Sequence, residues 1–408
     1  MSSYWQILRY RPAQLLLLSA FPGRFAYGMI SLAIYFKVYQ DTSAIGTAGL
    51  AVGLNGLAGA LSAGFRSAVI DKFGLLIPLR ILVPSYSLLI ITFNHLHGAF
   101  LLVLVSMIMG FTAPPINLAV RPIWKVTVPQ EWYRATFAVD TAMMSVTAVI
   151  GPVVATSLAL SAHPSFGLNT AAALMVMSGI SISLLSMTKK WRPEERIAGG
   201  PSLLSSPAIR LLMLEGAFVG LGTGTFEIAI PAFATLKNVQ GHTGPIFAAL
   251  AIFNVVGSLI GGLLSKSFSP LAAFRLTYFS WFIASLPLAL LNPDWSLMIG
   301  ASFLGLAIGA QQVFYWEITE AVRPQGSAAS AIGWLWTVEG SCAALGTTLG
   351  GYISQHFSPR WSLLMTTISI AIGLIVVLWG SKFLHAANQI PSDEQDIRAL
   401  DDTSSTEN

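Results

Sequence analysis

Charged residues are scarce in this chain: of its 408 residues only 10% are Asp, Glu, Lys or Arg, whereas 54% are hydrophobic. A soluble domain carries roughly 25% charged residues, because it must present a hydrated surface. The composition therefore excludes a soluble fold and indicates a chain whose solvent is lipid. The net charge of +4 does not indicate nucleic-acid binding, because the basic residues lie in short segments between apolar runs.

Cysteine and metal-ligand patterns are almost absent. The single Cys342 lies in an apolar stretch, so there is neither a disulfide framework nor a thiolate metal site. The histidines show no metal-type spacing such as His-Glu-x-x-His, and no Walker sequence occurs. The glycine run Gly220-x-Gly222-x-Gly224 has no preceding strand, which favours close helix packing over nucleotide binding. We expect no metal, no cofactor and no direct use of ATP within the chain.

Apolar runs of about 20 residues recur along the whole sequence, and this is the length that crosses about 30 Å of hydrocarbon. Six predicted spans precede a polar segment and six follow it. They cover residues 13–36, 43–65, 75–93, 98–120, 136–160, 167–187, 208–233, 243–264, 272–291, 295–317, 327–351 and 361–381. The sequence thus predicts an all-α integral membrane protein of twelve transmembrane helices in two six-helix halves.

The polar segment also sets the predicted domain boundaries. We expect an N-terminal half at 1–188, a central loop at 189–207, a C-terminal half at 208–384 and an acidic tail at 385–408, which composition predicts to be disordered. The halves share a faint repeat, because Pro12 and Phe73 recur as Pro207 and Phe268 at one spacing (207 − 12 and 268 − 73 are both 195). This repeat supports two parallel copies of one unit.

Basic residues predict the orientation, because Lys and Arg collect in short cytoplasmic loops. Only Lys37, Lys237 and Arg360 lie on one predicted side, whereas the other basic residues near the spans, such as Arg9 and Arg66, lie on the opposite side. This asymmetry predicts a multi-pass protein of the cell membrane with both termini and the central loop in the cytoplasm.

Ionisable residues inside predicted spans are the first candidates for function, because each costs at least about 2.5–3.5 kcal/mol at the bilayer centre. Arg24 and Glu339 are predicted near the midplane, where a membrane protein built from two repeated halves can hold a ligand or an ion between them. Arg24 would suit an anionic group, but a fixed Arg24–Glu339 ion pair that only joins the halves is the alternative. Glu227, in the outer part of its span, is the better proton-site candidate, and a hydrogen bond to a neighbouring helix is its alternative.

Other polar residues carry weaker predictions. Asp140, Glu215, Glu317 and Glu320 fall within about two turns of predicted span ends, where we expect them to reach headgroups or loop bases. The uncharged candidates in the spans are Asn55, Asn117, Gln311 and Gln312. Either helix packing or substrate contact explains them. A bend is expected at Pro114-Pro115, where freed carbonyls must be satisfied by neighbouring groups or water.

Several motifs resemble those of the major facilitator superfamily of secondary transporters. Asp71-Lys72-Phe73-Gly74 fits the core of that family's motif after the second span, Gly-x-x-x-Asp-(Arg/Lys)-x-Gly. Arg121 is similar to the family's fourth-span arginine, and Gly151-Pro152 resembles the centre of its antiporter motif. A further likeness, to a poorly characterised bacterial branch typical of actinobacteria, rests on Arg24, Asp140 and Glu320.

This resemblance implies a secondary active transporter of a small solute that works by alternating access. Carboxylates in the spans and the partial antiporter motif favour a monomeric, proton-coupled permease of the efflux (antiport) type in the lipid bilayer. An uptake symporter or a facilitator is the alternative. A membrane-embedded enzyme is more remote, because the histidines fall outside the spans, and the soluble segments are too short for a receptor's signalling domain.

Overall fold

A computed structural model describes residues 2–128, 133–161, 165–190, 205–264, 269–323 and 328–389 of the chain. Within these ranges every secondary-structure element is a helix, as the composition predicts. Several predicted residues, among them Asp71, Lys72, Arg121 and Glu320, have side chains that lie outside the described residues, as does most of the predicted central loop and tail.

The first half of the chain forms nine helices within the described ranges. They are α1 Ser2–Arg9, α2 Arg11–Thr42, α3 Ile45–Phe73, α4 Leu76–His95, α5 Ala99–Thr112, α6 Ile116–Thr127, α7 Tyr133–Ala159, α8 Ser165–Leu184 and α9 Ser186–Lys190. The second half contains α10 Pro207–Leu236, η3 Gln240–His242, α11 Thr243–Leu264, α12 Pro270–Ser285, η4 Leu288–Leu290, α13 Trp295–Val322, α14 Ala328–His356, α15 Pro359–Trp379 and η5 Gly380–Gln389.

Nine helices in the described part of the chain are long and apolar enough to cross a membrane on their own. The other three crossings are the α5–α6 pair, α7 and α14, which brings the number to twelve. The helix α14 is rich in glycine, serine and threonine, because it packs closely against helices of both halves rather than facing only lipid. The prediction of twelve transmembrane helices in two six-helix halves is confirmed.

Several helices begin with a Ser-Pro pair. Ser206, Ser269 and Ser358 are the N-cap residues of α10, α12 and α15, and each is followed by proline at the first helical position. The serine hydroxyl accepts a hydrogen bond from a backbone N–H in the first turn, and proline lacks the N–H that would otherwise remain unpaired there. The sequence therefore fixes where these three helices start.

The fourth crossing is broken at Pro114-Pro115, as expected. The helix α5 ends at Thr112 and α6 begins at Ile116. The carbonyls that the break exposes are satisfied by side chains from other helices: the Tyr27 hydroxyl donates to the Pro114 carbonyl, and the Arg66 guanidinium donates to the Ala113 carbonyl. A break inside the membrane is stable only when such partners exist.

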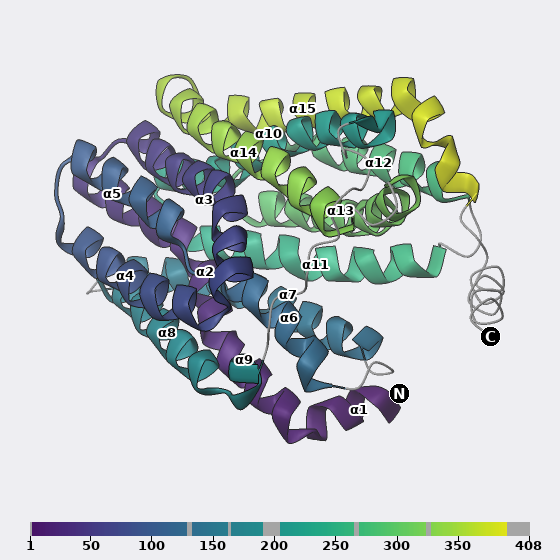
Figure 1. Ribbon diagram of the computed structural model, residues 1–408. Helices are drawn as coiled ribbons and strands as arrows, with labels where there is room; N and C mark the ends of the chain where they lie inside the picture. The colour runs from purple at the N-terminus through teal and green to yellow at the C-terminus, as the bar shows by residue number, and fades with distance from the viewer. Residues whose placement is uncertain are drawn as a thin grey trace, which may run out of the picture.

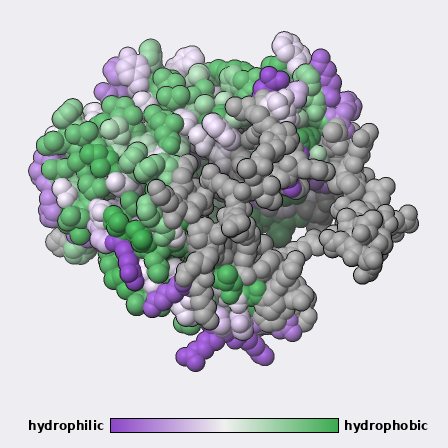
Figure 2. Space-filling model, in the orientation of Figure 1, coloured by the Kyte–Doolittle hydropathy of each residue, from purple (hydrophilic) through white to green (hydrophobic). Residues whose placement is uncertain are grey.

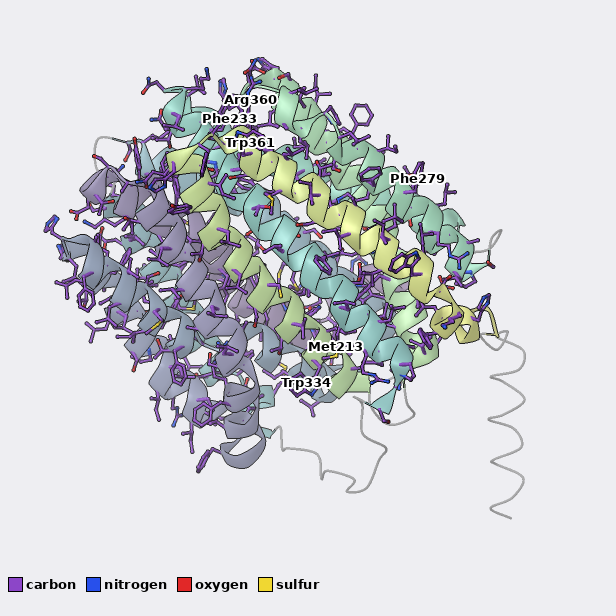
Figure 3. All side chains as sticks on the ribbon, turned by 90° about the horizontal axis from the view of Figure 1, so that it is seen from above. Met213, Phe233, Phe279, Trp334, Arg360 and Trp361 are labelled. Atoms are coloured by element: carbon purple, nitrogen blue, oxygen red, sulfur yellow. The ribbon has the colours of Figure 1, made fainter. Side chains whose placement is uncertain are left out.

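The outer surface suits a lipid environment. Large apolar side chains stand exposed on it, such as Leu18 at 71% and Phe100 at 76%, and Figure 2 shows broad hydrophobic areas on the described surface. Trp361 lies close to Arg360 and Phe233 at one end of the second half, and Arg360 packs over the Phe233 ring (Figure 3). Aromatic and basic residues at helix ends are typical of the membrane–water interface.

Each half has its own hydrophobic core. One core consists of residues from Ile7 to Met187 together with Ile228, and the other of residues from Ala208 to Leu384. Figure 1 shows α1 and η5 at the same end of the bundle, which we call the termini end, and we call the opposite end the far end. The helices of the two halves diverge toward the termini end in this view.

The halves meet through the far part of the bundle. The Gly46 N–H donates to the Gln355 side chain, and the Tyr35 hydroxyl lies 3.3 Å from Thr235 Oγ1. Along α3 and α14 the backbones approach so closely that a Cβ added to Gly49 would lie 2.9 Å from Gly351 Cα. The structure is therefore closed at the far end.

We expect Gly53→Ala to hinder this closure. A Cβ at Gly53 would lie 2.7 Å from the Ala344 carbonyl oxygen and 2.1 Å from Thr348 Oγ1, so α3 and α14 must separate. Overpacking costs about 1–3 kcal/mol, which shifts a two-state equilibrium about 5- to 150-fold. Electron paramagnetic resonance can measure the distance between spin labels at Ser43 and Phe357 in a Cys342→Ala background. In Gly53→Ala the distribution of this distance should contain a larger share of long distances than in the protein with Gly53.

The matched control is Gly56→Ala, one turn further along α3. Its added Cβ would lie 3.6 Å from the Ala344 Cβ, which is an ordinary contact. It should leave the distance distribution unchanged, and equal distributions in the two variants would contradict closure through Gly53.

Candidate functional site

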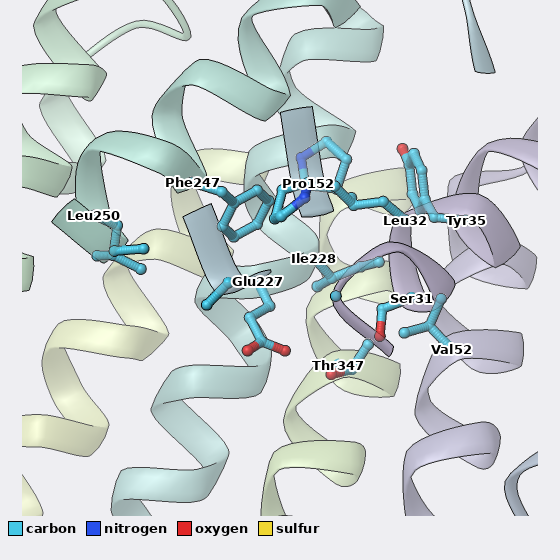
Figure 4. A pocket seen from close by; sticks show the side chains of 14 residues that line it. Ser31, Leu32, Tyr35, Val52, Pro152, Glu227, Ile228, Phe247, Leu250 and Thr347 are labelled. Carbon is cyan, nitrogen blue, oxygen red and sulfur yellow. The ribbon is translucent and has the colours of Figure 1, made fainter. Parts of the chain in front are cut away.

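A cavity of about 300 Å³ lies between the two halves. Helices α2, α3 and α7 of the first half and α10, α11 and α14 of the second half contribute to its wall (Figure 4). Its lining residues are Gly28, Ser31, Leu32, Tyr35, Val52, Ala148, Pro152, Glu227, Ile228, Pro231, Phe247, Leu250, Ala251 and Thr347. A cavity at the junction of the halves is where a fold built from two units can hold a ligand.

The cavity is apolar except for one carboxylate and three hydroxyls. The Tyr35 hydroxyl pairs with Thr235, and the Thr347 hydroxyl donates to the Ala343 carbonyl at 3.0 Å, so both are already engaged. Glu227 is exposed to this space, and no described residue forms a hydrogen bond or an ion pair with its carboxylate. No described residue of the lining is basic. The site therefore contains one carboxyl group that has no partner among the described residues.

Pro152 of the predicted antiporter motif lines this cavity, whereas Gly151 serves close packing. A Cβ on Gly151 would lie 2.7 Å from the carbonyl carbon of Gly28, so α7 and α2 touch backbone to backbone there. On the other side of α7, Gly244 of α11 packs against Pro152 and Val153. The motif therefore lies where the first half contacts the second.

Arg24 is paired, but with a different acid from the one proposed from the sequence. Its Nη1 and Nη2 donate to the two carboxylate oxygens of Asp140 at 2.8 and 3.1 Å, and its Nε donates to Asn117 at 3.1 Å. Trp124 Nε1 donates to Asp140 as well, at 3.1 Å. The Arg24–Glu339 pair was wrong, because Asp140 offers a bidentate partner within the same half.

The expectation that Asp140 reaches headgroups was also wrong. Its residue is 2% exposed, because α7 turns this side chain inward toward α2 and α6 rather than along the bilayer surface. Trp124 was missed from the sequence, where a tryptophan near a span end is typical of an interfacial anchor. The Arg24 guanidinium is thus neutralised by Asp140 and hydrogen-bonded within the first half.

The second half holds a cluster of acids and tyrosines with no basic partner among them. Glu215 on α10 is 1% exposed, so the prediction that it reaches lipid headgroups was wrong. Glu339 lies near it on α14. The hydroxyl of Tyr278 on α12 interacts with Glu215 without hydrogen-bond geometry, and that of Tyr315 on α13 also has no described partner. Both Glu215 oxygens lack a hydrogen bond within the described residues.

Glycines bring this cluster together. A Cβ on Gly220 would lie 2.1 Å from the Glu339 carbonyl oxygen, and one on Gly224 would lie 1.9 Å from that of Ala343. The backbones of α10 and α14 are therefore in direct contact, and this contact places Glu339 beside Glu215. The glycine run packs helices, as the sequence indicates.

The remaining described candidates lie outside the cavity lining. The Asn55 amide donates to the Ser106 carbonyl at 2.8 Å and so joins α3 to α5. Gln311 is buried and Gln312 is exposed. Gly74 is the C-cap of α3 at φ 77°, a left-handed conformation that explains a glycine after Asp71-Lys72-Phe73, which form the last turn of α3 rather than a loop.

We expect Asp140→Leu alone to destabilise the protein by about 3–5 kcal/mol, because it leaves Arg24 as an uncompensated buried charge. Arg24→Met together with Asp140→Leu should recover most of this loss. Thermal unfolding in detergent measures both. The control is the double variant Arg24→Met, Glu339→Met. It should stay destabilised, since the Asp140 carboxylate has then lost its charged partner. Recovery in the control, or no loss in the single variant, would contradict the pair.

Comparisons with known proteins agree with this architecture. Residues 16–347 match the family model of the Major Facilitator Superfamily. The fold is similar to the crystal structure of nucleoside transporter NupG (TM-score 0.69, 12% identity, covering 91% of this chain and 99% of that one). It is also similar to a bacterial homologue of iron transporter ferroportin in an inward-facing state (TM-score 0.71, 12% identity, 91% and 98% covered).

A POT family transporter in complex with 5-aminolevulinic acid gives a TM-score of 0.72 at 12% identity, with 91% and 96% covered. No curated protein sequence gives a significant match. At these identities the structures show the fold alone, whereas the family model spans most of the sequence. The chain belongs to the major facilitator superfamily.

Proposed function

We propose that this protein is a proton-coupled antiporter that exports a small solute across the cell membrane by alternating access. The observation that carries the proposal is the cavity between the halves, which is closed at the far end and holds the unpaired carboxylate of Glu227. An uncompensated carboxylate in an apolar cavity is costly, so it favours binding a proton or another cation.

Closure at the far end supports transport by alternating access. The two halves contact each other through α3 with α14 and α7 with α11. Rocking of one half against the other would open these contacts and expose the cavity on the far side. The pairing of Arg24 with Asp140 stabilises the first half as a unit during such a motion.

The acids of the second half supply further proton sites. Glu215 and Glu339 lie close together without a described basic partner, and two like charges in one apolar site cannot both be ionised cheaply. We therefore assign Glu227 as the main site of proton exchange and the Glu215–Glu339 pair as a secondary one. An uptake symporter or facilitator remains the alternative, and the direction of flux decides between them.

Two further assignments belong to this proposal. The loop charges support cytoplasmic termini, so that the cavity would face the cytoplasm in this structure. The sequence likeness at Arg24 and Asp140 supports an actinobacterial type of branch, and a monomer suffices, because both halves of the cavity come from one chain.

Proton coupling predicts that solute flux follows an imposed pH gradient. Proteoliposomes loaded with a pH indicator and screened against a panel of metabolites and drugs should show solute-induced proton movement. Glu227→Gln should reduce the coupled flux at least about tenfold, because the amide cannot take up or release a proton. The control is Glu317→Gln, a carboxylate near the end of α13 and outside the cavity lining. Flux that ignores the gradient in all variants would refute coupling.

The orientation is tested by cysteine labelling in a Cys342→Ala background. His97 has a side chain that is 78% exposed at the far end. An impermeant thiol reagent outside intact cells should label a cysteine at His97 but not one at Gly199 in the predicted central loop. The reverse pattern would show the opposite topology.

A further inference from the structure

The charge of the cavity limits which solutes can bind there. Among the described residues that line the cavity, Glu227 is the single charged one, and none is basic. Two arginines of the first half are engaged elsewhere: Arg24 is bound by Asp140, and Arg66 donates to the carbonyls of Gly59 and Ala113. An ionised Glu227 would therefore repel an anionic solute, and the described lining offers that solute no cationic partner.

The apolar wall limits the solute further. Leu32, Val52, Ile228, Phe247 and Leu250 line the same cavity as the carboxylate, so the body of the solute must be apolar to replace water there. In Figure 4 the Glu227 carboxylate and the Ser31 and Thr347 hydroxyls lie on one side of the Phe247 ring. Aromatic rings such as Phe247 and Tyr35 also attract cations.

We propose that this cavity binds a small organic ammonium ion, with its charged nitrogen at Glu227 and its apolar body against Phe247 and Leu250. The volume of about 300 Å³ suits a compact amine rather than a peptide or a sugar chain. The substrate class rests on the proposed function, because it places the solute at the carboxylate that exchanges protons.

Such a site links the two fluxes through competition. A protonated Glu227 is neutral and has no charge to attract the ammonium group, whereas an ammonium ion at the carboxylate excludes the proton. One carboxylate can hold one of the two cations at a time, so binding of the solute releases the proton.

The experiment compares three probes that share a phenyl ring and a short chain: 2-phenylethylamine, 2-phenylethanol and 3-phenylpropionate. Binding to the purified full-length chain in detergent at neutral pH is measured by calorimetry. The amine should bind at least tenfold more tightly than the alcohol, and the acid should not bind. Glu227→Gln should remove the preference for the amine, whereas Glu317→Gln should keep it.

Equal or tighter binding of the alcohol or the acid would overturn the proposal, as would absence of binding by all three probes. If Glu227→Gln does not fold, the comparison of the three probes on the unaltered protein still decides. Glu227→Asp provides a second variant, because it keeps the charge and should retain the preference for the amine.

The same probes separate this inference from the proposed function. If the amine binds but does not exchange with protons in proteoliposomes, the antiporter proposal fails and the substrate class stands. If protons exchange with a neutral or anionic solute instead, the antiporter proposal stands and the substrate class fails.

Discussion

A charge inside the bilayer must be neutralised by a partner or hydrated in a cavity, and the two halves of this protein meet that constraint differently. In the first half, Arg24 is held by both carboxylate oxygens of Asp140 and by Asn117. In the second half, Glu215, Glu227 and Glu339 have no described basic partner. The Arg24–Asp140 pair therefore balances its charges within the first half, and the carboxyl groups of the second half are the ones that we propose take up cations.

Glycine packing connects this asymmetry to motion. The helix α14 touches α10 within its own half at Gly220 and Gly224, and it touches α3 of the other half at Gly49 and Gly53. A helix in backbone contact on both sides cannot move at one interface without changing the other. Glu339 lies on α14 beside Gly220, so the protonation of the acid cluster and the closure of the far end act on the same helix.

The fold could be predicted from the sequence almost completely, because span length and loop charge are local properties. Every predicted span corresponds to a helix or to the broken α5–α6 pair. The errors in predicted burial fell on residues near span ends. Asp140 and Glu215 were expected at the surface, but helix direction turned both inward, and hydropathy alone does not report which face of a helix meets its neighbours.

Pairing between helices is the part of the site that sequence reasoning could not reach. Depth in the membrane suggested Arg24 with Glu339, yet the choice between Asp140 and Glu339 depends on how α2, α6 and α7 pack, which no single span encodes. That choice changes the chemistry of the cavity. An arginine free at the midplane would favour an anion, whereas an arginine neutralised by Asp140 leaves Glu227 as the charge that a solute meets. The sign of the charge that we propose for the substrate therefore depends on the Arg24–Asp140 ion pair, which lies outside the cavity lining.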